Sequence, residues 1–165
     1  MDNFDRDKDE YWMGHALALA QEAANLGEVP VGAIVVHNEQ IIGAAHNLRE
    51  SNQDPLAHAE TLAVQQAAKY LGSWRLEGCT VYVTLEPCPM CAGALWLSRI
   101  SRCVFGCTDP RSGYLQSIGN LMDHQILNHH YEITSGIREK ECSEILRTFF
   151  RRIRKKKSSK PKSPS

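Results

Sequence analysis

Apolar residues recur every three or four positions near the start of the chain, and this stripe stops before Gly27. Such spacing places the side chains on one face of a helix, so we expect an amphipathic helix there. The stripe consists of Trp12, Ala16, Leu19, Ala23 and Leu26. Two β-rich runs follow, VPVGAIVV and QIIGAA, with only His37-Asn38-Glu39 between them. So short a connection predicts a hairpin of two antiparallel strands.

The middle of the chain alternates between loop, helix and strand patterns. Residues 47–57 lack periodicity and include Asp54-Pro55, which indicates a loop, and a helical pattern then runs from about Ala57 to a stop at Gly72. The run TVYVTL is apolar on both faces, as in a strand covered by helices on each side. Pro87 suits the first turn of a helix that continues through CPMCAGALWLS.

The last third of the chain adds two more strands and a helix. CVFGC predicts a strand, and EITSGI predicts a last short strand. A terminal helix has one apolar face, formed by Cys142, Ile145, Leu146, Phe149, Phe150 and Ile153. Strands that alternate with helices favour an α/β protein, a three-layer α/β/α sandwich around a mixed five-stranded sheet. The 165 residues suffice for one such domain.

The charges divide the chain into two parts. The net charge is zero, but residues 151–165 carry eight Lys or Arg and no acid, which leaves 11 basic and 19 acidic residues in the first 150. We therefore expect a folded body at 1–150 and a basic helix end with a flexible tail at 151–165. Such arms commonly contact nucleic acid. The alternative is a solvated tail that only aids solubility.

Composition excludes few classes of protein. A hydrophobic content of 42% and a charged content of 23% are those of an ordinary globular protein. No apolar run approaches the roughly 20 residues that span a bilayer, and the first ten residues are acidic and polar, unlike a secretory signal. We expect a cytoplasmic protein whose six cysteines stay reduced.

The stretch TLEPCPMCAGA contains the first candidate chemistry, because Cys88 and Cys91 stand three positions apart. By itself this spacing has three interpretations. The pair is a redox dithiol, or it forms a closed structural zinc site with Cys103 and Cys107, or it supplies two ligands of a catalytic metal. The pair alone does not choose among them.

His58-Ala59-Glu60 opens the predicted helix before the cysteines, and a single strand separates the two groups. In an α-β-α unit both helix starts lie at one edge of the sheet, so the groups can converge. Two thiolates and one imidazole suit Zn²⁺ and leave a fourth position for water, whose pKa zinc lowers to about 7. Glu60 stands where it can move that water's proton. This favours a catalytic site.

These motifs resemble those of a known enzyme superfamily. His-Ala-Glu followed by Thr-Leu-Glu-Pro-Cys-Pro-Met-Cys is similar to the signature of the cytidine/nucleoside deaminases. Further stretches resemble the bacterial tRNA-specific adenosine deaminases, and this similarity extends over about residues 9–154. They include Tyr-Trp-Met at 11–13, Glu-Val-Pro-Val-Gly-Ala at 28–33, Asp109 and Phe149-Phe150. Departures at Arg111, Asn120 and His130 fall in loops and leave details of the substrate open.

The resemblance implies a cytidine deaminase-like fold and a role for each matching residue. It implies one Zn²⁺ per subunit, held by His58, Cys88 and Cys91, with Glu60 as the proton shuttle. It also implies substrate contacts from Asn47, Pro30, Val31, Ala59, Leu85, Glu86, Asp109 and Phe150. Two alternatives remain from the residues themselves, because Asn47 also suits a turn and Asp109 also suits a loop cap.

The implied reaction is hydrolytic deamination of adenosine to inosine at wobble position 34 of the tRNA-Arg anticodon loop, with release of ammonia. The implied partners are tRNA and a second copy of the chain, both subunits shaping the RNA site. Two alternatives belong beside it: a deaminase of free guanine, cytosine or a nucleotide, and a non-catalytic zinc or redox protein.

Overall fold

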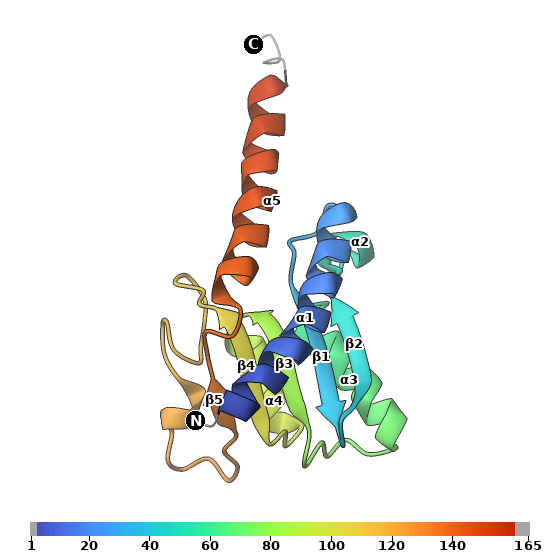
Figure 1. Cartoon of the computed structure of the whole chain (residues 1–165), viewed down its shortest axis with the longest axis vertical. Helices are drawn as coiled ribbons and strands as arrows, with labels where there is room; N and C mark the ends of the chain where they lie inside the picture. Colours follow the sequence, from blue (N-terminus) through green and yellow to red (C-terminus); the bar gives the residue numbers. More distant parts are fainter. Residues whose placement is uncertain (1–2, 161–165) are drawn as a thin grey trace.

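The computed structural model describes residues 3–160, which form one mixed sheet with helices on both faces (Figure 1). The elements are, in chain order, α1 (Asn3–Asn25), β1 (Gly32–His37), β2 (Gln40–His46), α2 (Arg49–Asn52), α3 (Ala59–Leu71), β3 (Thr80–Leu85), α4 (Pro89–Leu97), β4 (Arg102–Cys107), the 3₁₀ turn η1 (Leu121–Asp123), β5 (Glu132–Thr134) and α5 (Glu139–Ser159). The predicted five-stranded α/β architecture is confirmed.

The sheet has the strand order β2-β1-β3-β4-β5. Strand β1 is antiparallel to β2 and β3, whereas β3, β4 and β5 run parallel. The predicted hairpin is present, and its two loop residues, Asn38 and Glu39, both have positive φ angles. A two-residue loop of this kind matches the right-handed twist of the strands it joins. The parallel half of the sheet places the ends of β3 and β4 at one edge.

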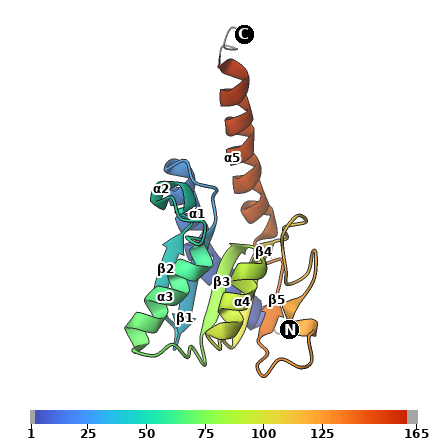
Figure 2. The same ribbon diagram turned by 180° about the vertical axis from the view of Figure 1, so that it is seen from behind.

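Alternate residues of the central strands belong to two apolar cores, as the period of a β-strand requires. On one face, Val35, Val83 and Phe105 pack with α3 and α4. On the other face, Ile34, Tyr82 and Val104 pack with α1 and α5. Figure 1 shows the α1 side of the sheet and Figure 2 the α3 and α4 side. The two cores define the three layers.

Two glycines let helices lie directly on the strands. A Cβ atom at Gly32 of β1 would overlap the backbone oxygen of Ala16 in α1. A Cβ atom at Gly43 of β2 would likewise overlap the backbone oxygen of Ala63 in α3. The closely packed hairpin therefore holds the start of α3 at a fixed distance from the sheet.

Three local predictions need correction. Helix α4 begins at Pro89 with Cys88 as its N-cap, so Pro87 does not occupy the first turn. Leu26 is 62% exposed because α1 has already ended at Asn25, and the buried face of α1 comprises Met13, Ala16, Ala20 and Ala23. The segment predicted as loop, 47–57, contains the single-turn helix α2.

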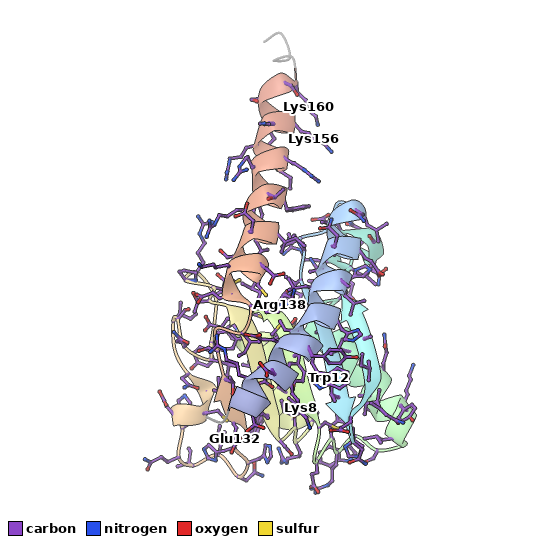
Figure 3. The ribbon with its side chains drawn as sticks, viewed as in Figure 1. Lys8, Trp12, Glu132, Arg138, Lys156 and Lys160 are labelled. Atoms are coloured by element: carbon purple, nitrogen blue, oxygen red, sulfur yellow. The ribbon has the colours of Figure 1, made fainter. Side chains whose placement is uncertain are left out.

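Helix α5 continues from the folded body into the basic segment. Its upper part stands clear of the sheet edge (Figures 1 and 2), and Lys156 and Lys160 lie toward its far end (Figure 3). The helix crosses the expected boundary at residue 150 and ends at Ser159. The division into a body and a tail stays a prediction, and its residues 161–165 lie outside the described part. Within residues 3–160, no helix is both long and apolar enough to cross a membrane.

Candidate active site

Two helices begin side by side and bring the predicted ligands together. His58 is the N-cap of α3 and Cys88 is the N-cap of α4, while Cys91 lies within the first turn of α4. Strand β3 ends at Leu85, just before Cys88, so the sheet sets the height at which α4 starts. Neither helix has a side-chain cap at its N-cap residue, which leaves the imidazole and the thiol directed elsewhere. The positive ends of both helix dipoles favour thiolate at this point.

The distances within the group match those between ligands of one tetrahedral metal ion. His58 Nδ1 lies 3.7 Å from Cys88 Sγ and 3.5 Å from Cys91 Sγ. All three ligand atoms lie within 4.8 Å of one another. Zinc bonds of about 2.3 Å to sulfur and about 2.05 Å to nitrogen place such atoms about 3.5 Å apart in a tetrahedron. In the described part of the chain, this is the one group of three or more His, Cys, Asp or Glu side chains with metal-binding spacing.

The cysteines outside this group do not form a second half of the site. None of the six is in a disulfide. Cys103 is fully buried among the apolar residues of the sheet core, and the Cys107 thiol donates to the carbonyl oxygen of Thr84. The four-cysteine structural site therefore does not assemble. His58 joins Cys88 and Cys91 instead.

The surroundings of Cys88 favour its thiolate. Hydrogen bonds from the Cys91 thiol and the His58 ring outweigh partial burial and lower the pKa of Cys88 to about 4. The same hydrogen bond to Cys88 raises the pKa of His58. Cys88 is also the least buried of the six cysteines. The surroundings thus favour the thiolate form of Cys88, which is the form that binds a metal ion.

Glu60 is the second residue of α3 and lies beside the three predicted metal ligands, and its side chain is buried. Burial raises the pKa of the Glu60 carboxyl, and the nearby Cys88 charge raises it further. A carboxyl group whose pKa moves toward neutrality exchanges protons readily at physiological pH. The structure therefore places a buried carboxyl group of raised pKa next to the group that could hold a metal ion.

A small cavity of about 130 Å³ opens over this group. It is lined by Val29, Val31, Asn47, Arg49, His58, Ala59, Glu60, Leu85, Glu86, Cys88, Asp109 and Ser112. Its volume is several times that of a water molecule, roughly 30 Å³, but below the roughly 300 Å³ of a site for a drug-sized ligand. It suits one planar base better than a whole nucleotide.

The comparisons with known proteins agree with this chemistry. A model of the MafB19-like deaminase family matches residues 7–154. A tRNA-specific adenosine deaminase of Bacillus subtilis is 51% identical over 158 residues, which are 96% of this chain and 98% of that protein. The chain belongs to the tRNA-specific adenosine deaminase family.

Two solved structures place the fold among deaminases. One comes from studies of A-to-I editing by tRNA:A34 deaminases at the wobble position of transfer RNA. It has a TM-score of 0.80 and 38% identity, and the match covers 82% of this chain and 99% of that one. A guanine deaminase of Bacillus subtilis has a TM-score of 0.58 and 37% identity over 60% of this chain and 64% of that one. The predicted cytidine deaminase-like fold is confirmed.

Six of the substrate contacts expected for a tRNA-specific adenosine deaminase line the cavity: Val31, Asn47, Ala59, Leu85, Glu86 and Asp109. Pro30 is buried and does not line it. Phe150, 42% exposed, lies instead in an adjoining groove of about 390 Å³ beside α5. The groove and the cavity share the lining residues Val29, Asn47 and Arg49, so they adjoin one another.

Asn47 and Asp109 both have structural hydrogen bonds as well as a place at the cavity. The Asn47 side chain accepts from the Arg49 amide and donates to the Val29 carbonyl oxygen. The Asp109 carboxylate accepts from the Arg111 amide and the Ser112 hydroxyl. The turn and loop-cap interpretations are therefore correct for these side chains. They do not exclude a contact with substrate, because each side chain also lines the cavity.

Sequence reasoning missed several residues of the site. Val29, Arg49 and Ser112 line the cavity, although no substrate contact was expected from them. Val29 belongs to the β-rich run VPVGAIVV, whereas Arg49 and Ser112 stand in loop segments. Two of the departures from the tRNA-specific adenosine deaminase pattern have local roles, since Asn120 caps η1 and His130 contacts the His124 carbonyl oxygen. The only advance signal for Arg49 was its position two residues after Asn47.

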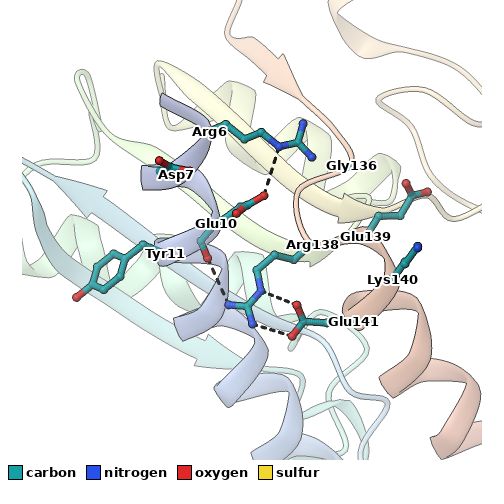
Figure 4. Close-up of a pocket in the computed structure, with 9 residues that line it drawn as sticks. All are labelled: Arg6, Asp7, Glu10, Tyr11, Gly136, Arg138, Glu139, Lys140 and Glu141. Atoms are coloured by element: carbon teal, nitrogen blue, oxygen red, sulfur yellow. Dashed lines mark hydrogen bonds and ion pairs between the residues drawn. The ribbon is translucent and has the colours of Figure 1, made fainter. Parts of the chain in front are cut away.

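A larger hollow, about 750 Å³, lies away from this chemistry between the start of α1 and the start of α5 (Figure 4). Two ion pairs lie within it, Arg6 with Glu10 and Arg138 with Glu141, and Arg138 also donates to the Glu10 carbonyl oxygen. The His58, Cys88 and Cys91 group does not lie there. Size alone therefore does not identify the active site of this deaminase.

Proposed function

We propose that the chain hydrolyses adenosine to inosine at wobble position 34 of tRNA, with release of ammonia and with one bound Zn²⁺ per subunit. The observation that carries this proposal is the convergence of His58, Cys88 and Cys91 with buried Glu60 beneath a base-sized cavity. Membership of the tRNA-specific adenosine deaminase family supports the same reaction. Zinc is the metal favoured by a set of two thiolates and one imidazole.

His58, Cys88 and Cys91 would hold the ion and leave one tetrahedral position open. When bound, zinc supplies a hydroxide nucleophile at neutral pH by lowering the pKa of water to about 7. Glu60 accepts the proton that the water loses and donates it to N1 of adenine, which makes C6 electrophilic. The water oxygen bonds to C6, and Glu60 then transfers the second water proton to the amine at C6 as the C–N bond breaks. Water and adenosine become inosine and ammonia, and Glu60 returns to its starting state.

The other residues of the cavity would orient the base. Asn47 has an amide hydrogen and a lone pair beyond those of its turn, and both suit the edge of a purine. Val31 offers an apolar surface, and the backbone of Ala59 and Leu85 supplies polar groups near C6. We propose that Glu86, Asp109 and Phe150 also help to position the substrate. Pro30 is buried behind the lining residues and would support them.

An anticodon loop is the natural form of this substrate. A duplex hides C6 of adenine in the base stack, whereas a loop exposes unstacked bases. The groove that adjoins the cavity is lined in part by Phe150, Arg154 and Lys157, a combination that suits flanking bases and phosphates. We take the tRNA to be tRNA-Arg and the location to be the cytoplasm.

The surface of α4 supports a homodimer. The helix sequence PMCAGALWL contains no charged, hydroxyl or amide side chain, yet Pro89 and Leu97 are exposed and a Cβ atom at Gly93 would meet open space. Leu97 is 61% exposed on this helix. A helix that is apolar all round is normally buried. We propose that a second copy covers it and that both subunits shape the RNA site.

Inosine formation in a tRNA transcript tests the function. Purified protein loaded with zinc is incubated with an unmodified tRNA-Arg transcript that carries adenosine at position 34. We expect conversion of that base alone, read by reverse transcription. Glu60→Ala is the matched control and should keep its zinc while it loses conversion. Conversion of free guanine, cytosine or a nucleoside without conversion of the transcript would overturn the proposal. Full activity of Glu60→Ala would overturn the mechanism.

A further inference from the structure

The Glu86 carboxylate is an internal anchor for the loop that follows β4. Glu86 is 2% exposed, and its two oxygens accept five hydrogen bonds from that loop. The donors are the backbone amides of Asp109, Leu115, Gln116 and Ser117 and the Ser117 hydroxyl. Three successive amides, 115 to 117, point at one oxygen at 3.2, 2.8 and 2.9 Å. Successive amides of this kind form a nest for an anion.

The loop closes tightly around this carboxylate. A Cβ atom at Gly113 would overlap the Glu86 carboxylate, so a larger residue there would displace that carboxylate from its donors. The amide of Tyr114 also bonds to the Pro87 carbonyl oxygen, 2.8 Å away. The same loop contributes Asp109 and Ser112 to the cavity. Glu86 thereby fixes one wall of the cavity to the segment that carries Cys88.

Glu28 anchors a second wall of the cavity in the same way. Leu48, the N-cap residue of α2, provides no side-chain cap. The Glu28 carboxylate caps α2 instead, from a distant part of the chain. It accepts hydrogen bonds from the amides of Glu50 and Ser51, at 3.2 and 2.6 Å, and from the Ser51 hydroxyl. Glu28 is 1% exposed. The anchored segment carries Asn47 and Arg49, which line both the cavity and the adjoining groove.

We infer that Glu28 and Glu86 are positioning residues for deamination, each fixing one wall of the substrate cavity through a buried carboxylate. The inference rests on the proposed function. Neither carboxylate needs to contact the reacting atoms, because both spend their acceptor capacity on backbone amides. An acceptor-only carboxylate satisfies several donors at once, whereas the amide of glutamine offers one oxygen and turns two hydrogens toward the remaining donors. Replacement by glutamine should therefore loosen the wall without removing side-chain volume.

The test compares Glu86→Gln and Glu28→Gln with the wild-type protein on a stem-loop RNA of the anticodon arm. We expect kcat/KM to fall about ten- to hundredfold in each variant, because small displacements of positioning groups are costly. Zinc content should stay at one ion per chain. Amide hydrogen exchange should accelerate within residues 109–117 in Glu86→Gln and within 49–52 in Glu28→Gln, each variant leaving the other wall protected.

Asp9→Asn provides a matched control, because Asp9 is an equally buried carboxylate that is bonded to Tyr82 and Arg102 and lines neither the cavity nor the groove. It should lower the Tm and leave kcat/KM unchanged when all proteins are assayed well below their Tm values. A wild-type kcat/KM in both glutamine variants would overturn the inference, and so would an equal loss in Asp9→Asn.

Ser117→Ala keeps the inference testable if Glu86→Gln does not fold. It removes one of the five donors. We therefore expect a smaller loss in kcat/KM than in Glu86→Gln, with amide hydrogen exchange accelerated only within residues 109–117. A wild-type kcat/KM with unchanged exchange in Ser117→Ala would overturn the role of Glu86. If the wild-type protein itself does not convert the stem-loop, the proposed function fails instead, and the two failures are thus distinguished.

Discussion

Two hydrogen bonds join Asp9 of α1 to Arg102 of β4, Nη1–Oδ1 at 2.8 Å and Nη2–Oδ2 at 2.6 Å. The Tyr82 hydroxyl donates a third bond to the same carboxylate. Because Asp9 is buried, its removal would leave a guanidinium without its partner. We expect Asp9→Ala to lower the free energy of unfolding by about 3–5 kcal/mol in urea titrations. The exposed Arg6–Glu10 pair is the control, and Glu10→Ala should change stability by less than about 1 kcal/mol. Equal losses in the two variants would contradict this ranking.

Metal binding should depend on Cys91 and not on Cys103. Both thiols are fully buried, so they are matched in exposure. Cys91→Ser should reduce zinc to well below one ion per chain after dialysis, because it removes a ligand. Cys103→Ser should retain the ion at wild-type stoichiometry, although a hydroxyl in the core costs some stability. Elemental analysis of the folded variants measures both. Loss of zinc from Cys103→Ser would mean that His58, Cys88 and Cys91 are not the complete set of protein ligands.

Alkylation should reveal the thiolate of Cys88. Its pKa is lowered to about 4, so after chelation Cys88 is a thiolate throughout pH 6–8 and its rate with iodoacetamide should be nearly flat. An ordinary thiol, with a pKa of about 8.5, reacts up to about tenfold faster with each added pH unit in this range. Zinc should suppress the fast reaction, and Cys88→Ser should abolish it. A rate that climbs steeply with pH would show that Cys88 is protonated.

Lysines of the projecting helix end should control the salt dependence of RNA binding. Replacement of Lys155, Lys156 and Lys157 by alanine leaves the helix intact, because alanine has the highest helix propensity. Each phosphate contact with single-stranded RNA contributes about 0.7 to the slope of log K against log salt. We expect the slope to decrease by up to about 2, measured by fluorescence anisotropy of a labelled stem-loop at several salt concentrations. An unchanged slope would mean that these lysines do not neutralise phosphates.

A charge on α4 should separate the subunits. Leu97→Glu places a carboxylate on the uncovered apolar side of the helix, where it costs a monomer little because Leu97 is already exposed. We expect light scattering to give the mass of a monomer, with wild-type circular dichroism and with reduced conversion of the tRNA transcript. A dimer that persists in this variant would place the interface elsewhere.

The sequence was informative wherever a pattern repeats or a reactive residue stands at an element boundary. Short β-rich runs predicted the hairpin and the later strands, and helical spacing predicted the first and last helices, because burial of one helix face leaves a period in the sequence. His58 and Cys88 were expected to meet since each opens a helix on either side of one strand, and their 3.7 Å separation agrees. Local spacing thus predicted a tertiary contact.

What the sequence did not predict depends on single contacts between distant segments. Pro87 and Pro89 fit a first turn equally well by residue type, and only the end of β3 decides for Pro89. Helix α2 lacks a local capping residue and depends on Glu28. Glu86 was expected as a substrate contact, yet its carboxylate anchors a loop more than twenty residues away in the chain. Hydrogen bonds between such distant segments leave no periodic pattern in the sequence.

The two glutamate anchors separate recognition from chemistry in this fold. The proposed metal ligands and Glu60 belong to the starts of α3 and α4, whereas two walls of the cavity belong to loops that are each bonded to one buried carboxylate. Substitutions in a wall can therefore change which base enters and leave the reacting groups in place. The same arrangement of reacting groups can in this way act on different nucleobases in different proteins. Substitutions in one anchored loop can change which base is accepted.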